Sequence, residues 1–439
     1  MRETVKISKI FLLIEKFQKL DRSLIYMILV LGLISILSLY SIDKGQGTIY
    51  LKHLVRFVFA FIILITVAFA HVNFWYRYAY HFYFLILFLL LVLKFVGVTA
   101  KGAQRWLDFG FFHVQPSEVA KLAIILVLAK FYNLVKVENT NKIFSLLVAA
   151  ILILFLLIVL KFVGVTAKGA QRWLDFGFFH VQPSEVAKLA IILVLAKFYN
   201  LIKVENTNKL FSLLVSAILI LIPFLLVLRQ PDLGTAVLIL GAALGTLWIV
   251  GLNRKIFISG FIIVILSLPF IFAAMKPYQK QRVVNFFNTE RDPLGANYQV
   301  IQAKIGIGSG GIFGKGYLRG SQSSLDFVPE NHTDFVFSHF AEEFGLIGSL
   351  LLLWLFFSII KRVTLIGDQS KNNFSKIFCY AFAFNFFLYI AINLGMVTGL
   401  LPVVGVPLPI LSYGGTAMLT NMIGFGIVLS SKLYNEDFI

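Results

Sequence analysis

The side chains best suited to chemistry are concentrated in one polar stretch, Lys276–Glu343. Its acid–base candidates are Asp292, Glu330, His332 and Asp334, and its cations include Lys280, Arg282, Lys315 and Arg319. Carboxylates and imidazoles move protons, and cations stabilise negative charge that develops during a reaction. A solvated hairpin loop is the simpler interpretation, but the density of acids, bases and glycines favours a catalytic or binding surface.

Glycines in the middle of this stretch do not indicate a nucleotide site. Gly306, Gly308 and Gly311 match GxGxxG, but no strand precedes them. A Walker A loop also fails, because Gly316 follows Lys315 where Ser or Thr is required. We expect instead that these glycines let backbone N–H groups approach a phosphate or a lipid headgroup. The histidines lack a metal-ligand spacing such as HExxH, and His332 is predicted to belong to a polar network.

A second group of charges lies inside apolar segments. Glu118 and Lys121 stand three residues apart, and the same pair recurs as Glu185 and Lys188. Side chains at this spacing share one helix face, and charges within a membrane usually pair with each other or line a cavity. Two interpretations of this pair remain open: a local ion pair that faces the helix bundle, or part of the wall of a polar cavity. Asp232, close to a helix start, is predicted to be a helix cap.

The elements that must position these side chains are membrane helices. Of the 439 residues 59% are apolar and 14% charged, and the mean hydropathy is +0.88. This composition excludes a soluble domain and a disordered chain. The single cysteine, Cys379, excludes a disulfide framework. The chain has 39 Lys and Arg against 21 Asp and Glu, and the basic residues cluster in short loops. There they orient the helices in the membrane and contact lipid headgroups. The positive charge therefore does not indicate a nucleic-acid partner.

A window of roughly 20 apolar residues predicts an all-α, polytopic bundle with about twelve spans. We expect a basic cytoplasmic leader at 1–22, a single transmembrane domain at 23–431 and a cytoplasmic tail at 432–439. The predicted spans are 23–41, 54–72, 79–99, 118–135, 143–160, 185–202, 210–228, 233–251, 256–275, 338–360, 376–398 and 408–431. Basic residues in alternate short loops place both termini in the cytoplasm and the long connection, 276–337, outside.

The chain contains a tandem duplication of 67 residues. Residues 94–154 recur as 161–221 with three differences, so 93–160 and 160–227 are near-identical copies. Each copy adds two spans, which leaves the orientation of the following helices unchanged. We expect the second copy, with Glu185 and Lys188, to pack centrally, because its last helix keeps Pro223 and runs directly into the next span.

Several long motifs then occur in one order along the whole chain: KGAQRWLDFG, QPSEVAKLA, QPDLGTA, RDPLG, IGSGGIFGKG, PENHTDFVF, AEEFGLIG and NLGMVTGLLPVVGVPLPILSYGGT. With these motifs in this order, the chain resembles the SEDS family (FtsW/RodA/SpoVE). GVPLP and SYGGT are closer to the RodA-like elongation branch than to the FtsW-like cell-division branch. The resemblance implies a ten-helix core plus two duplicated helices.

The resemblance also implies an activity and its residues. SEDS proteins are peptidoglycan glycosyltransferases that polymerise lipid II with a class B penicillin-binding protein, in cell-wall elongation and shape maintenance. The family's catalytic aspartate corresponds to Asp292, which we interpret as a general base. Its cavity glutamate and lysine correspond to Glu185 and Lys188 or to Glu118 and Lys121.

The remaining expectations concern ligands and alternatives. We expect Lys280, Arg282, Lys315 and Arg319 to face the leaving diphosphate, and Glu330, His332 and Asp334 to position the loop. No cofactor is certain; a divalent cation, Mg²⁺ or Mn²⁺, could bind at Asp292. Expected partners are lipid II, the penicillin-binding protein, other elongation-complex proteins and lipids of the bacterial cytoplasmic (inner) membrane. A lipid-linked precursor flippase and an inactive scaffold of the elongation complex are the alternative functions.

Overall fold

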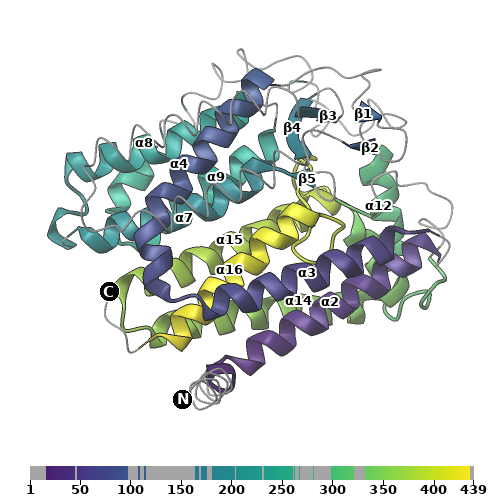
Figure 1. Ribbon diagram of the computed structural model, residues 1–439. Coiled ribbons are helices and arrows are strands. Elements are labelled where there is room, and N and C mark those ends of the chain that lie inside the picture. Colours follow the sequence, from purple (N-terminus) through teal and green to yellow (C-terminus); the bar gives the residue numbers. More distant parts are fainter. Residues whose placement is uncertain are drawn as a thin grey trace.

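The computed structural model describes residues 16–44, 47–96, 182–202, 204–229, 232–260, 298–320 and 332–435, with short strand segments within 107–114 and 164–181 and single positions at 262, 266 and 280. Helices dominate this part of the chain (Figure 1). They are α2 (Arg22–Asp43), α3 (Ile49–Phe69), α4 (Val72–Val96), α7 (Pro183–Leu201), α8 (Leu210–Arg229), α9 (Leu233–Ile249), α12 (Tyr298–Ser309), α14 (Val336–Gln369), α15 (Asn373–Val397) and α16 (Gly415–Leu433), with a 3₁₀ turn at Val204–Asn206.

Six described helices, α2, α3, α8, α14, α15 and α16, are long and apolar enough to cross a membrane. The all-α, multi-pass membrane prediction is therefore confirmed. Two of the twelve predicted spans, 118–135 and 143–160, and most of a third, 256–275, lie outside the described residues. The predicted start of the last span at 408 is wrong, because 402–414 contains no helix and α16 begins at Gly415. Pro402, Pro407 and Pro409 account for this, since proline lacks the amide hydrogen that a helix needs.

Short strands form in both copies of the duplicated segment. Strand β1 (Leu107–Asp108) pairs with β2 (His113–Val114), and β4 (Ala170–Asp175) pairs with β3 (Gly164–Ala167) and β5 (His180–Val181). The pair Leu107 with Val114 recurs 67 residues later as Leu174 with Val181. Identical local sequence thus forms the same antiparallel hairpin twice, a detail that helical patterning did not predict.

The core lies between two groups of helices. Helices α15 and α16 run between the α2–α3 pair and the group of α4, α7, α8 and α9 (Figure 1). Phe378, Phe382 and Phe386 recur at intervals of four on α15 and are at most 1% exposed. Phe382 and Phe386 contact Phe425 of α16, with ring centroids 5.0 and 5.3 Å apart. Within lipid the hydrophobic effect does not drive helices together, so van der Waals packing must hold them. These edge-to-face aromatic contacts contribute to that packing.

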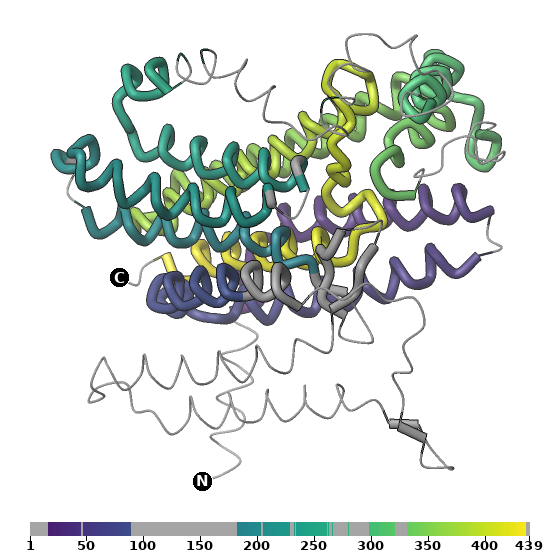
Figure 2. Tube along the Cα trace, turned by 90° about the horizontal axis from the view of Figure 1, so that it is seen from above, coloured from purple at the N-terminus to yellow at the C-terminus, as the bar shows by residue number. Residues whose placement is uncertain are grey.

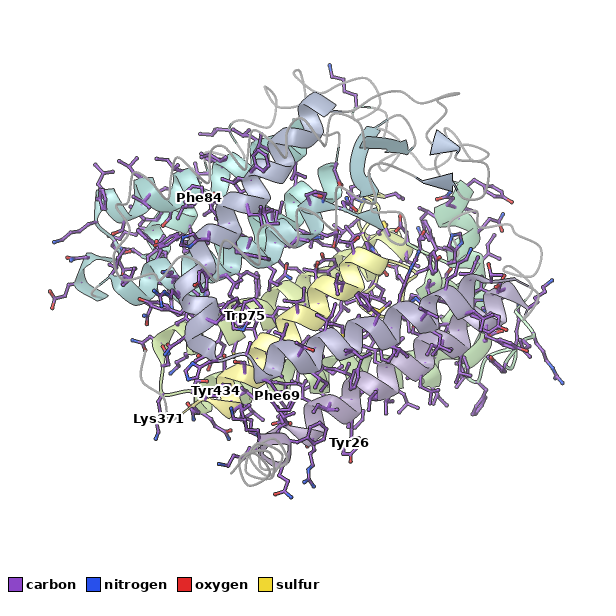
Figure 3. All side chains as sticks on the ribbon, viewed as in Figure 1. Tyr26, Phe69, Trp75, Phe84, Lys371 and Tyr434 are labelled. Atoms are coloured by element: carbon purple, nitrogen blue, oxygen red, sulfur yellow. The ribbon has the colours of Figure 1, made fainter. Side chains whose placement is uncertain are left out.

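Both described ends of the chain lie at one end of the bundle, opposite α12 (Figures 1 and 2). Lys16 donates to the hydroxyl of Tyr434 over 3.0 Å, and that hydroxyl donates to the carbonyl of Phe69 over 2.8 Å; Figure 3 labels Phe69 and Tyr434 there. Tyrosine with apolar and polar contacts is typical of a membrane boundary.

A buried carboxylate connects three helices at this terminal end. Asp21 caps α2 by accepting from the amide of Leu24 at 2.9 Å, and it also accepts from Arg362 of α14 and Lys432 of α16 at 2.6–3.0 Å. Burial opposes ionisation of Asp21, but the hydrogen bonds from Arg362, Lys432 and the Leu24 amide outweigh it and hold the pKa of the carboxyl below its usual value.

We expect Asp21→Asn to destabilise the protein by about 1–3 kcal/mol at neutral pH, because it removes charge-assisted hydrogen bonds. The lowered pKa means that this contribution is present above the unfolded-state pKa of about 3.9 and is lost as the pH falls through the folded-state value. Melting temperatures in detergent should differ between parent and variant from pH 7 to pH 5 and converge below about pH 4. A constant difference down to pH 3 would contradict this origin.

Helix α14 is broken at Gly345, whose φ of 65° and ψ of −163° are not helical. The backbone groups freed by the break bond to residues 310–318, here called the glycine loop. The amides of Lys315 and Gly316 donate to the carbonyls of Glu342 and Glu343 at 3.0 Å, and Leu346 donates to Gly311 at 2.9 Å. The loop therefore satisfies groups that would be costly to leave unbonded near lipid.

We expect Gly345→Ala to destabilise the protein by about 2–4 kcal/mol. An alanine Cβ would lie 2.3 Å from the amide nitrogen of Gly314, and its residue would keep a positive φ. The matched control is Gly308→Ala in α12, where no atom lies within 4 Å of an added Cβ and alanine favours the helix by up to ~1 kcal/mol. Thermal unfolding in detergent measures both, and equal melting temperatures would refute the steric argument.

Candidate functional site

A buried charged pair lies near the N-terminus of α7. Lys188 Nζ is 2.7 Å from Glu185 Oε1, and the two side chains are 1% and 6% exposed. The hydroxyl of Tyr389, on α15, donates to Glu185 Oε2 at 2.7 Å, and Lys188 Nζ lies 4.3 Å from the centre of the Tyr389 ring. The tyrosine therefore contacts both charges, as a hydrogen-bond donor to the anion and as a cation–π partner of the ammonium.

Polar contacts at the same end join α7 to α9 and α16. The amide group of Gln182 donates to Asp232 Oδ2 at 2.7 Å, and its backbone N–H donates to the hydroxyl of Thr416 at 3.3 Å. Asp232 accepts from the amide of Thr235 at 3.3 Å, which confirms the predicted cap. The N-termini of three long helices, α7, α9 and α16, thus meet around the charged pair.

Asn393 joins the return of the large loop to the segment before α16. Its buried amide group donates to the carbonyl of Asp334 at 2.8 Å and to that of Val406 at 2.7 Å. The amide of Tyr413 donates to the carbonyl of His332 at 2.9 Å. His332 and Asp334 thus hold the loop through their backbone oxygens, and the network expected of their side chains stays a prediction.

Sequence reasoning missed Tyr389 and Asn393. With Asn385 they form a polar row at intervals of four on the otherwise apolar α15, and all three are buried. A polar row within a membrane helix faces the protein interior rather than lipid. This spacing was the available signal. The row's packing against α7 depends on the tertiary fold and has no local signature.

The glycine loop has a different role from the one predicted. The amides of Gly311 and Gly314 bond to carbonyls of Gly308 and Gly310, and those of Lys315 and Gly316 bond at the break in α14. Gly306 and Gly308 lie within α12, so the expectation that these glycines present free N–H groups to a phosphate is wrong. Lys315 Nζ forms a 2.6 Å ion pair with the buried Glu342, a partner that we did not predict.

The other predicted site residues are distributed as follows. Arg319 is exposed at the end of the glycine loop, and Lys280 is a half-buried single position. Asp292, Arg282, Glu330, Glu118 and Lys121 lie outside the described residues. In the part of the chain that is described, no group of three or more His, Cys, Asp or Glu side chains could hold a metal ion. The predicted cation site at Asp292 stays a prediction.

Fold and site together define a polytopic helical membrane protein with a buried ion pair and a large polar loop anchored at one end. A family model described as cell cycle protein, FtsW/RodA/SpoVE, matches residues 18–154 and 135–436. The chain therefore belongs to the FtsW/RodA/SpoVE family. Two overlapping matches to one family model are also the expected consequence of the tandem duplication.

Individual relatives agree with this assignment. The peptidoglycan glycosyltransferase MrdB of Escherichia coli is 43% identical over 291 residues, which cover 65% of this chain and 77% of the relative. The probable peptidoglycan glycosyltransferase FtsW of Coxiella burnetii is 35% identical over 334 residues, 75% of this chain and 89% of the relative.

Solved structures have the same fold. A chain from a structure titled as structural coordination of polymerization and crosslinking by a peptidoglycan synthase complex superposes with a TM-score of 0.69 at 23% identity, covering 95% of this chain and 98% of that one. The rod shape determining protein RodA of Thermus thermophilus superposes with a TM-score of 0.60 at 21% identity, covering 95% and 98%.

Proposed function

We propose that this protein is a peptidoglycan glycosyltransferase that polymerises lipid II during cell-wall elongation. The observation that carries the proposal is the 43% identity to a peptidoglycan glycosyltransferase over most of that relative's length. The site agrees with it, because Asn393 and Tyr413 anchor the return of a large polar loop to a rigid helical core. A lipid-linked sugar can meet a catalytic group where that loop leaves the membrane.

Each polymerisation step joins two lipid-linked sugars. A hydroxyl of one sugar attacks the anomeric carbon of the other, a new glycosidic C–O bond forms, and the bond to the polyprenyl diphosphate breaks with inversion. Asp292 takes the proton of the attacking hydroxyl as general base. The cations Lys280, Arg282, Lys315 and Arg319 are the candidates to stabilise the diphosphate that leaves.

The charged pair on α7 supports this chemistry from within the bundle. Glu185, Lys188 and Tyr389 hold α7 and α15 in a fixed relation, and Asn393 on the same α15 holds the carbonyl of Asp334 in the large loop. We propose that the pair positions the loop and shapes the polar region beneath it. If a divalent cation binds at this site, Asp292 would be its ligand, and the cation would supply positive charge for the leaving diphosphate.

The proposed function also implies a membrane location and a partner protein. The polymerase resides in the bacterial cytoplasmic membrane with its large loop outside, and it works with a class B penicillin-binding protein. A structural neighbour carries a title that joins polymerization and crosslinking in one complex, which supports such a partner. Polar residues buried along α7 and α15 would also suit a flippase for lipid-linked precursors.

Complementation tests the elongation role. A rod-shaped bacterium depleted of its own elongation polymerase should regain its rod shape when it expresses this chain with its cognate penicillin-binding protein. Rescue of septation in cells depleted of the division polymerase, without rescue of shape, would instead assign the chain to cell division. Translocation of lipid II without polymer would favour the flippase.

A further inference from the structure

The glycine loop carries an apolar tip that nothing in the described fold covers. Ile312, Phe313 and Leu318 are 59%, 80% and 52% exposed, and Tyr317 is 36% exposed. The loop's backbone is meanwhile fixed by its hydrogen bonds to both sides of the Gly345 break. A rigid loop thus presents large apolar side chains outward, which is unusual for a surface in water.

Contacts between α2 and α14 place this tip relative to the bilayer. Arg362 of α14 contacts Asp21 at the start of α2, and Glu343 of α14 accepts from Ser41 near its end. The two contacts are about 20 residues apart along α2, or about 30 Å at 1.5 Å per residue, which matches the hydrocarbon thickness of a bilayer. The buried polar contacts therefore mark the two membrane boundaries on this helix pair.

The glycine loop lies at the second of these boundaries. The amide of Leu318 donates to Glu343 Oε1 at 2.8 Å, so the loop is level with the Ser41 contact. The hydroxyl of Tyr317 donates to the carbonyl of Leu37 at 3.1 Å, one helical turn toward the membrane centre. A tyrosine that reaches inward from a membrane boundary is characteristic of interfacial anchoring.

The apolar tip is also continuous with a lipid-facing stripe of α14. Just after the Gly345 break, Leu346 and Ile347 are 54% and 45% exposed and bond to the glycine loop. The stripe continues at helical spacing through Leu350, Leu351, Trp354 and Phe357, which are 55–66% exposed. Because α14 qualifies as a membrane span, the same lipid that covers this stripe reaches the loop tip.

We propose that Ile312, Phe313 and Leu318 insert into the bilayer surface at the large-loop end and anchor the hairpin of α12 and the glycine loop to the lipid. The partner is the boundary between headgroups and acyl chains, and the exposed Arg319 beside the tip suits anionic headgroups. If the proposed function holds, the anchor keeps the catalytic loop at the height where a lipid-linked substrate carries its diphosphate.

Spin-label depth measurements test the insertion directly, independently of catalysis. The sole native cysteine, Cys379, is fully buried, so nitroxides can be attached at Phe313→Cys in the full chain. The protein would be placed in nanodiscs of phosphatidylethanolamine and phosphatidylglycerol without other proteins. Leu351→Cys, on the stripe of α14, is the control in lipid. Lys371→Cys, exposed in the connection at the terminal end (Figure 3), is the control in water.

We expect the label at position 313 to collide more often with oxygen than with a water-soluble nickel chelate, as the label at 351 does, whereas the label at 371 shows the reverse. A label at 313 that behaves like the one at 371 would overturn the proposal. It would mean that the tip is exposed to water, as it would be if it awaited a protein partner. Ile312→Cys repeats the test with a second side chain of the same tip.

Discussion

Lys188→Ala is expected to lower the free energy of unfolding by about 3–5 kcal/mol, the usual result of removing one partner of a buried ion pair. The variant leaves the Glu185 carboxylate buried without its cation, while the Tyr389 hydroxyl still donates to it. We expect the melting temperature in detergent to fall and polymerisation to be lost, because α7 lies in the core of the described helices.

The duplication offers a matched control for this prediction. Lys121→Ala makes the same change in an identical local sequence of the other copy, and we expect it to leave the melting temperature nearly unchanged if only the second copy packs centrally. A double variant, Glu185→Gln with Lys188→Met, should regain much of the lost stability because no unpaired charge remains. Equal losses for Lys121→Ala and Lys188→Ala would contradict a unique role for α7.

Asp292→Asn is expected to reduce the rate of lipid II polymerisation by about 10²–10⁴-fold, the usual contribution of a general base. Asparagine has the same shape but cannot accept the proton of the attacking hydroxyl. The melting temperature should stay within a degree or two of the parent's, so that the loss reports chemistry. The measurement is the initial rate of glycan formation from labelled lipid II.

The control for Asp292→Asn is Asp368→Asn. Asp368 is an exposed carboxylate on α14, toward the terminal end of the bundle, and its replacement should leave polymerisation unchanged. If Asp292→Asn retained the parental rate, another group would have to take the proton. If both variants lost activity equally, the effect would be one of net charge rather than of acid–base chemistry.

Membrane helices were largely predictable because their signals are local. Runs of about 20 apolar residues predicted α2, α8 and α15 to within a few residues, and charges three apart predicted that Glu185 and Lys188 share one face. Asp232 was predicted as a cap from its place at a helix start. In each case a few residues that are neighbours in the sequence determine the local conformation. The pattern can therefore be recognised from the sequence without knowledge of the tertiary structure.

The contacts that complete the site were not predictable in this way. Tyr389 donates a hydrogen bond to Glu185, which is 204 residues away in the sequence. Asn393 donates to carbonyls of two separate segments. The glycine loop was misinterpreted because the amides of Lys315 and Gly316 bond at a break in α14, and the sequence gives no sign of that break. Pairings of this kind depend on which helices become neighbours, and periodicity does not carry that information.

The most direct test of this account is polymerisation of lipid II by the unmodified 439-residue chain, purified with its class B penicillin-binding protein, whose own crosslinking is blocked by a β-lactam. The account predicts long glycan strands on a gel, released as short muropeptides by muramidase. Absence of glycan, both from this chain and from a version that lacks one 67-residue copy, with both proteins folded, would contradict it.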